Sequence, residues 1–240
     1  MSSAAGDSAH NSKTVDRALR LLSEVAVAPS GLSLSASARR VGLPVSTAAR
    51  LLKSLESGGF LVRTAANVYK AGPAVLQIGA IALANFEIVT MAEPHLRQLA
   101  DYTGETAYLA TPRGQDAATY LKQVESPRAI RHATWVGRAI GTAGTALGAA
   151  LEGRVNQQGF AMSRATAVEP DATAAAAPVI DSGGDIVAAI SIIGPAFRID
   201  DAALHDYGEQ VAEHARLLSE QLRLLPPQAS HLTQVARTVR

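Results

Sequence analysis

Hydrophobic residues recur at helical spacing in two short segments near the start of the chain, and a tight turn separates them. The first segment, about 35–41, ends at Gly42, a residue type that readily takes the left-handed conformation that closes a helix. Pro44 follows, and proline both stops one helix and suits the first turn of the next. In the second segment the apolar positions fall at i, i+3, i+4 and i+7, which is one buried stripe of a helix. This stripe consists of Ala48, Leu51, Leu52 and Leu55.

The opposite face of the second predicted helix carries hydrogen-bond donors. A helix-turn-helix that binds DNA needs one packed face and one face that offers donors to phosphates and base edges. The pattern therefore predicts a helix-turn-helix and favours a DNA-binding protein. The donors are Ser46, Thr47, Arg50, Lys53 and Ser54.

The flanking segments extend this motif. An amphipathic helix is predicted over 13–26, and two β-prone runs, 60–62 and 68–70, surround a turn. Three helices and a hairpin make a winged helix-turn-helix over residues 13–72. Further candidate DNA contacts are Arg39 in the first short helix and Arg63 and Lys70 on the wing.

Residues 73–89 predict one long helix that is apolar on nearly every side. A helix with this pattern is buried against the second domain, against a partner chain, or against both. Periodicity alone equally fits a core helix of a monomer. We assign residues 73–90 as a linker helix.

From residue 91 to residue 225 the pattern becomes α+β. The last helix carries one apolar side, and Asp181-Ser182-Gly183-Gly184 is a strong hairpin signal. Residues 1–12 predict a disordered tail, and residues 226–240 a flexible one. We expect strands at 105–111, 117–124, 130–136, 174–180 and 186–193, helices at 94–102, 141–151 and 200–225, and irregular chain at 155–170.

Composition and charge narrow the class. Apolar residues make up 48% of the 240, so a disordered chain is excluded, and the absence of cysteine excludes disulfides and thiolate chemistry. The start shows no signal-peptide pattern and no apolar run reaches the roughly 20 residues of a membrane span, so we expect a soluble cytoplasmic protein. Residues 1–73 hold nine basic and four acidic side chains, whereas the remainder holds 13 and 17. A basic N-terminal third fits phosphate binding, although two ordinary solvated surfaces remain an alternative.

Motifs for catalysis or cofactor binding are lacking. The spacing of Gly141, Gly144 and Gly148 matches neither the GxGxxG pattern nor the Walker pattern of nucleotide-binding proteins. Such small residues instead allow the N-terminus of a helix to lie close to a sheet or to a small anion. The six histidines show no metal-binding spacing, and no nucleophile elbow accompanies the serines. We therefore expect no enzyme and no cofactor. Ser191 is polar within an apolar run, so its hydroxyl needs a partner, either a backbone carbonyl or a ligand.

Eight segments follow one another in a distinctive order and spacing along nearly the whole chain. They are TVDRALRLLSEVA (14–26), GLSLSASARRVGLPVSTAARLLKSLESGGFL, YKAGPAVLQIG, AEPHLRQLADYTGETAYLA (92–110), QVESP, VGRAIGTAGTALGAAL (136–151), APVID and ISIIGPAFRID (190–200). In this order and spacing the chain resembles the IclR family of bacterial transcriptional regulators. The resemblance implies a winged helix-turn-helix, a linker helix and a GAF-like α/β effector-binding domain, working as a dimer or a dimer of dimers.

Carried over by position, the resemblance implies two sets of site residues. The DNA contacts fall on Ser46, Thr47, Arg50 and Lys53, while Val45 and Ala49 depart from the Lys and His that the family often carries. The effector pocket differs from the family's pattern at Ile193, which replaces the family's second serine. The floor of the pocket would therefore be more apolar than in the family. If Arg164 points inward, it would add a cationic side chain. The effector contacts are Gly141, Thr142, Gly144, Thr145, Arg164, Ala174 and Ser191.

The segment between Leu151 and Gly159 is short, because family members commonly have some tens of residues there. The effector domain is thus expected to be shortened, with a minimal lid or degenerate sensing. We expect a homo-oligomeric regulator that binds a double-stranded DNA operator, senses a small anionic metabolite such as an organic acid, and has no membrane partner. The alternative is a ligand-binding or interaction module that has weakened or lost DNA binding, effector sensing, or both.

Overall fold

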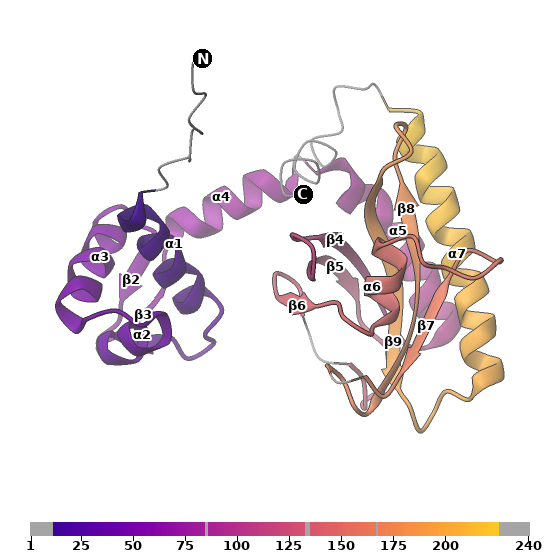
Figure 1. Cartoon of the computed structure of the whole chain (residues 1–240), viewed down its shortest axis with the longest axis horizontal. Coiled ribbons are helices and arrows are strands. Elements are labelled where there is room, and N and C mark those ends of the chain that lie inside the picture. The colour runs from indigo at the N-terminus through magenta and orange to yellow at the C-terminus, as the bar shows by residue number, and fades with distance from the viewer. Residues whose placement is uncertain (1–11, 85, 133–134, 167, 226–240) are drawn as a thin grey trace, which may run out of the picture. The chain divides into compact units, whose positions relative to one another are not determined.

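The computed structural model describes residues 12–84, 86–132, 135–166 and 168–225. Most of both predicted tails (1–12 and 226–240) lies outside this part of the chain. The chain divides into two compact units, Met1–Leu83 and Ala84–Arg240. Figure 1 shows both, and each is described by itself.

The first unit is a winged helix-turn-helix. Its helices are α1 (Lys13–Ala26), α2 (Leu34–Val41), α3 (Val45–Ser57) and α4 (Pro73–Ala84), and its strands are β1 (Leu32–Ser33), β2 (Leu61–Arg63) and β3 (Val68–Ala71). The strands form an antiparallel sheet in the order β1-β3-β2. The predicted helices and hairpin are confirmed within one or two residues, while the two-residue strand β1 was not predicted.

The turn between α2 and α3 has the predicted chemistry. Gly42 caps α2 with φ 67°, the left-handed region that glycine enters without a steric cost. Pro44 is the N-cap of α3, so its missing N–H leaves no helical bond unmade. The stripe residues Ala48, Leu51 and Leu52 are buried against α1 and α2, which fixes the orientation of α3.

The prediction of one long helix over 73–89 is wrong. Helix α4 ends at Ala84, and a separate helix, α5 (Glu87–Thr103), begins after it and runs through Pro94. Proline removes one helical hydrogen bond, but the turns before it bury Ile88 and Ala92 in the core of the second unit. Burial of this apolar face outweighs the missing bond, so the helix begins before Pro94 rather than at it.

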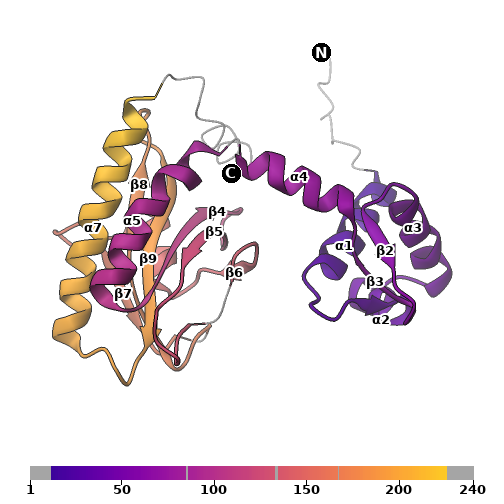
Figure 2. The ribbon, with the colours of Figure 1, turned by 180° about the vertical axis from the view of Figure 1, so that it is seen from behind.

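The second unit is one antiparallel sheet with helices on both faces. The strand order is β6-β5-β4-β9-β8-β7. Helices α5 and α7 cover one face, and α6 lies on the other (Figures 1 and 2). The bounds are β4 (Thr106–Pro112), β5 (Ala117–Val124), β6 (Ala139–Gly141), α6 (Ala146–Leu151), β7 (Ala161–Arg164), β8 (Ala172–Ile180), β9 (Ile186–Pro195) and α7 (Asp201–Arg223).

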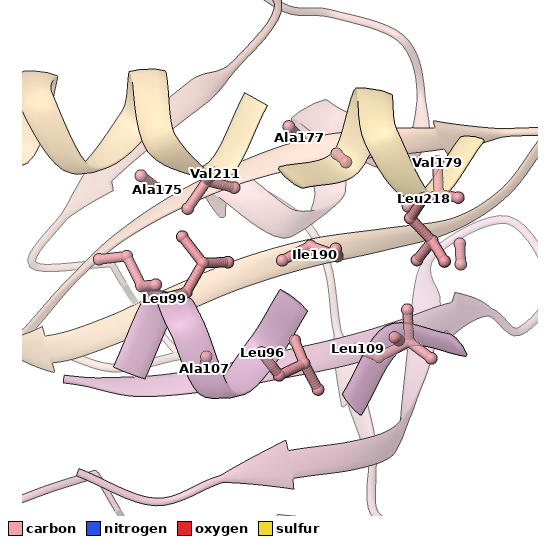
Figure 3. Packing of buried hydrophobic residues seen from close by; sticks show 14 of the residues in the cluster. Leu96, Leu99, Ala107, Leu109, Ala175, Ala177, Val179, Ile190, Val211 and Leu218 are labelled. Atoms are coloured by element: carbon pink, nitrogen blue, oxygen red, sulfur yellow. The ribbon is translucent and has the colours of Figure 1, made fainter. Parts of the chain in front are cut away.

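The main core lies between the sheet and the pair α5 and α7. Figure 3 shows Leu96 and Leu99 of α5 and Val211 and Leu218 of α7 packed around Ile190 of β9. All five are fully buried. Burying side chains of this size stabilises the unit by about 1.5–3 kcal/mol each before the entropy of ordering is subtracted.

Three segments of the second unit differ from the structure that the sequence predicted for them. The described residues of 130–136 form no strand, because the carbonyl of Ile130 and the N–H of Trp135 bond to side chains instead of a neighbouring strand. The predicted helix 141–151 is helical only over α6, since its first residues belong to β6 and a turn. The irregular segment 155–170 contains β7, which pairs with β8.

No single helix among the described residues is long and apolar enough to cross a membrane. A bent pair, Pro73–Ala82 with Glu87–Thr103, passes the same test by length and composition.

Candidate functional site

The outward face of α3 presents the predicted donors. Ser46, Arg50 and Lys53 are exposed, and Thr47 is half-buried. The helix is anchored from behind by its buried stripe, so these side chains project from a fixed frame. Val45, at the first turn, is 51% exposed, which places an apolar side chain among the donors.

Three further cations lie outside α3. Arg39, Arg63 and Lys70 are exposed, and within the described residues none of them forms a salt bridge. The guanidinium of Arg63 lies 5.7 Å from the ring centroid of Tyr69, which orients it on the wing. Arg40 differs, because its Nη1 pairs with Glu24 Oε2 at 3.3 Å.

The second unit has an inner cavity on the α6 side of the sheet. Its volume is about 20 Å³, enough for roughly one water molecule. Of the predicted effector residues, Thr145, Ala174 and Ser191 line it. The remaining lining is Tyr120, Ile140, Ala146, Leu147, Ser163, Thr166, Val168, Glu169, Ala172, Thr173 and Ile193.

The other predicted effector residues lie off this lining. Gly141 and Gly144 are exposed, and Thr142 is buried beneath the turn that precedes α6. The structure corrects the expectation for Arg164, whose guanidinium turns away from the cavity. Its Nη1 donates to the carbonyl of Ala196 at 3.1 Å, and its Nη2 donates to the carbonyl of Ile199 at 2.8 Å and to Asp201 Oδ1 at 3.0 Å.

The glycine-rich segment brings the start of α6 close to its own turn. A Cβ added at Gly148 would lie 2.1 Å from the Thr142 carbonyl oxygen, so only glycine fits there. Thr145 caps the helix by accepting from the Gly148 N–H at 3.0 Å, and Ser163 Oγ accepts from the Ala146 N–H at 3.0 Å. The predicted close approach is therefore real, and the protein itself supplies the partners.

A chain of polar groups borders the inner cavity. The hydroxyl of Tyr108 and Nδ1 of His132 share a hydrogen bond of 2.6 Å, and Nε2 of His132 pairs with Glu169 Oε1. Burial raises the pKa of the Tyr108 phenol and of the Tyr120 phenol, and the nearby Glu169 carboxylate raises both pKa values further. Both phenols therefore stay protonated and act as neutral hydrogen-bonding groups.

A buried ion network holds the loop that carries His132. Glu105 accepts from Arg128 Nη1 at 2.8 Å and from Arg198 Nε and Nη2 at 2.8 and 2.7 Å. Arg198 Nη2 also donates to the carbonyl of Ile130 at 3.1 Å. The network thus fixes the loop two residues before His132.

An outer groove of about 360 Å³ adjoins the inner cavity. The two share Glu169 and Ala172, so Glu169 lies at the boundary between them. Two exposed apolar side chains, Ile130 and Phe197, stand on its rim. The other groove residues are Arg131, His132, Pro170, Asp171, Gly194 and Pro195.

Tyr108, Tyr120, His132 and Glu169 were not predicted. The two tyrosines lie on predicted strands, but the residues around them show no alternation of polar and apolar types that would have placed them on one face. His132 and Glu169 gave no signal, because they are 37 residues apart and lie outside regular elements. Among the described residues no cluster of three or more His, Cys, Asp or Glu side chains could hold a metal ion.

Family models match both units. The IclR helix-turn-helix domain matches residues 14–65, and the bacterial transcriptional regulator IclR C-terminal domain matches residues 80–153 and 152–220. The chain belongs to the IclR family of bacterial transcriptional regulators. As in that family, the helix-turn-helix domain is joined to a C-terminal effector-binding domain.

Several relatives extend over most of this IclR-family chain. The HTH-type transcriptional regulator BhcR of Paracoccus denitrificans is 30% identical, covering 86% of both chains. The HTH-type transcriptional repressor AllR of Salmonella typhi is 25% identical, covering 90% of this chain and 92% of its own.

Solved IclR structures share the fold. The IclR regulator of Alicyclobacillus acidocaldarius has a TM-score of 0.76 at 21% identity, with 88% of this chain and 99% of that chain covered. An IclR homologue of Microbacterium hydrocarbonoxydans, solved in complex with 4-hydroxybenzoate, has a TM-score of 0.70 at 19% identity, covering 87% and 98%.

Proposed function

We propose that this IclR-family regulator binds a double-stranded DNA operator through residues 13–72, with α3 in the major groove. The observation that carries the proposal is the donor face of α3, where Ser46, Thr47, Arg50 and Lys53 stand out from a buried stripe. Exposed cations on α2 and the wing, Arg39, Arg63 and Lys70, supply phosphate contacts. The protein acts in the cytoplasm and catalyses no reaction.

The regulator works as a homo-oligomer, a dimer or a dimer of dimers. Two recognition helices related by symmetry read a pseudo-palindromic operator. Helix α4, with residues up to 90 as the linker, supports this assignment because it leaves large apolar side chains uncovered in the first unit.

Residues 91–225 bind a small-molecule effector in the inner cavity, and binding changes the affinity for DNA. The support is a polar cluster and an apolar lining on the face of the sheet that α6 covers, together with 4-hydroxybenzoate bound by a homologue of the same fold. The segment 152–160, where α6 ends and the chain turns into β7, holds no helix that covers the cavity.

Replacement of Arg50 tests DNA binding. If Arg50 contacts a base, Arg50→Ala weakens operator binding by about 1–3 kcal/mol, or about five- to 150-fold. The operator is first selected from genomic fragments with the purified full-length protein, and affinity is then measured by band shift. Arg113→Ala, in a turn of the second unit, is the matched control and retains full affinity. Equal affinities for Arg50→Ala and the wild type remove Arg50 from the interface.

Salt dependence separates the proposal from the alternative in which DNA binding has been lost. Phosphate contacts release counterions, so the logarithm of the binding constant falls linearly with the logarithm of salt concentration. The proposal requires a steep slope for the selected operator. A module that no longer recognises DNA gives no selected sequence and no such slope.

A further inference from the structure

The inner cavity offers no countercharge for an anion. Among its described lining residues Glu169 is the only one with a charged side chain, and no lysine or arginine is present. The one cation that sequence placed there, Arg164, bonds to Ala196, Ile199 and Asp201 instead. An anion moved from water into such a site loses its hydration and gains no ion pair.

Protonation of His132, which neighbours the cavity, does not supply the missing countercharge. His132 pairs with Glu169, so the pair carries a net charge of −1 when the imidazole is neutral and zero when it is protonated. In neither state is the pair positive.

Two N–H groups near the start of α6 already have side-chain acceptors. The N–H groups of Ala146 and Gly148 donate to Ser163 Oγ and Thr145 Oγ1. Thr173 Oγ1 donates to the carbonyl of Ser163 at 3.0 Å. An anionic ligand would have to break these bonds before it could use the same groups.

One polar atom in the cavity is free. Ser191 is 1% exposed, and its Oγ has no hydrogen-bond partner among the described residues. Strand register pairs Ser191 with Tyr108 on one side and with Ala176 on the other, so its side chain lies on the α6 face of the sheet, where the cavity is. A buried hydroxyl without a partner is costly, and a ligand that bonds to it recovers that cost.

The rest of the cavity is largely apolar. Ile140, Leu147, Ala174 and Ile193 line it beside the ring of Tyr120. Such a wall favours aromatic or aliphatic carbon over a hydrated head group. A ligand larger than water must widen the cavity, and the outer groove adjoins it at Glu169 and Ala172. The groove also holds Asp171 and Arg131, and Arg131 pairs with Glu125, so Glu169 is the charged group at the entrance to the cavity itself.

We propose that the effector of this regulator is a small, uncharged, mainly apolar molecule with one hydrogen-bonding group for Ser191 Oγ, and that organic anions are rejected. This inference rests on the proposed role of the inner cavity as the effector site. It replaces the anionic metabolite expected from sequence with a neutral one, and it identifies Ser191 and Glu169 as the residues that determine ligand specificity.

Matched pairs of carboxamide and carboxylate test the charge. The probes are benzamide with benzoate, 4-hydroxybenzamide with 4-hydroxybenzoate, and butyramide with butyrate, because each pair differs little in shape. Binding to the full-length protein without DNA is measured by calorimetry and by the shift in Tm. We expect the preferred amide to bind at least about tenfold more tightly than its carboxylate. Equal or tighter binding of the carboxylates overturns the proposal, as does the absence of binding by every probe at millimolar concentration.

Two variants locate the effect. Ser191→Ala weakens the preferred amide by about three- to tenfold, the net worth of one hydrogen bond. Glu169→Gln reduces the ratio of amide affinity to carboxylate affinity, because the charge that repels the carboxylate is removed. Ser182→Ala, on the exposed β8–β9 turn, is the matched control and changes neither the amide affinity nor the ratio of amide affinity to carboxylate affinity. If Ser191→Ala and Glu169→Gln both bind every probe like the wild type, the cavity is not the site.

Failure of this inference is distinguishable from failure of the proposed function. Ligand binding is measured without DNA, and operator binding is measured without ligand. Neutral probes that bind in the cavity but leave the band shift unchanged support the ligand class and contradict effector regulation. Carboxylates that bind and release the operator support regulation and contradict the ligand class.

Discussion

At the scale of single residues, Glu105 shows how one buried charge organises a surface loop. Its carboxylate is fully buried and accepts from the guanidinium groups of Arg128 and Arg198, both of which reach solvent. The hydrogen bond to Glu105 is the main cause that raises the pKa of Arg198 above its usual value. Since Arg198 also holds the carbonyl of Ile130, the loop before His132 depends on one carboxylate far away in sequence.

Glu105→Gln is therefore expected to destabilise the second unit by about 3 kcal/mol, because two guanidinium groups lose their buried partner. The free energy of unfolding from urea titration measures the loss. Glu93, which is partly exposed and pairs with Arg97 and Lys122, gives a control, since Glu93→Gln should cost about 1 kcal/mol or less. A cost for Glu105→Gln as small as that of Glu93→Gln contradicts the network's role.

At the scale of elements, α6 is short and depends on close packing. Gly148 lies against the Thr142 carbonyl, where a Cβ would approach to 2.1 Å. Backbone cannot give way as a flexible side chain can, so the turn 142–145 and the helix must move apart. The cavity wall formed by Ala146 and Leu147 moves with them.

Gly148→Ala should consequently destabilise the second unit by about 1–3 kcal/mol, although alanine is the better helix former. Thermal unfolding of the variant measures it. Ala149→Gly, at the neighbouring half-buried position, serves as the control and should cost about 1 kcal/mol from helix propensity alone. A variant Gly148→Ala as stable as the wild type shows that the turn relaxes freely.

The contact between α5 and α7 contains a histidine pair. Nδ1 of His95 and Nδ1 of His214 lie 3.0 Å apart, and His95 Nε2 bonds to Gln221 Oε1 at 3.4 Å. Burial, and then the charge of His95, lowers the pKa of His214, while Glu213 opposes this shift. Two protonated rings at this distance repel each other, so the folded state disfavours the second proton.

This pair predicts a loss of stability in acid. The pKa of His214 is lower in the folded state than the ordinary value of 6.5, so the unfolded state binds more protons once the pH falls to that range. The free energy of unfolding should therefore drop as the pH falls through and below about 6.5. Urea titrations at pH 7.5 and 5.5 measure the drop, and His214→Gln should reduce it. An equal drop in the variant assigns the pH dependence to other groups.

At the scale of the whole molecule, α4 carries apolar side chains that its own unit does not cover. Leu76 is 68% exposed, and Ile78 and Ile81 are each 55% exposed. Apolar residues grouped in this way on one helix mark an interaction surface. Within the proposed oligomer, α4 of a second copy of the chain is the partner that would cover them.

Leu76→Glu with Ile81→Glu should shift the protein from oligomer to monomer, because charges buried in an apolar interface cost several kcal/mol. Sedimentation velocity at several concentrations measures the mass. Operator binding should weaken as well, since the two DNA-binding domains that contact the two half-sites are no longer held together. The control, Gln77→Glu at an exposed position of the same helix, adds negative charge without touching those apolar residues. An unchanged mass places the interface elsewhere.

Sequence alone determined the parts that depend on neighbours within a few residues. Gly42 and Pro44 specify the turn through backbone geometry, and the spacing of Ala48, Leu51 and Leu52 specifies which side of α3 is buried. The strands paired through the Asp181–Gly184 turn follow from the same local rules. The resemblance to the IclR family, carried over by position, placed Ala174 and Ile193 in the cavity floor, and both line the cavity.

Tertiary structure decided what depends on residues far apart in the chain. Helix α5 continues through Pro94 because its first turns find a core in the second unit, which no local rule contains. Arg164 turns from the cavity because carbonyls of the loop after β9 accept its hydrogen bonds. His132 and Glu169 meet only after β4, β5 and β8 are assembled. The pairing of these two side chains sets the charge at the cavity wall. Sequence could not reveal it, since electrostatic pairing depends on distance in space and not on separation in sequence.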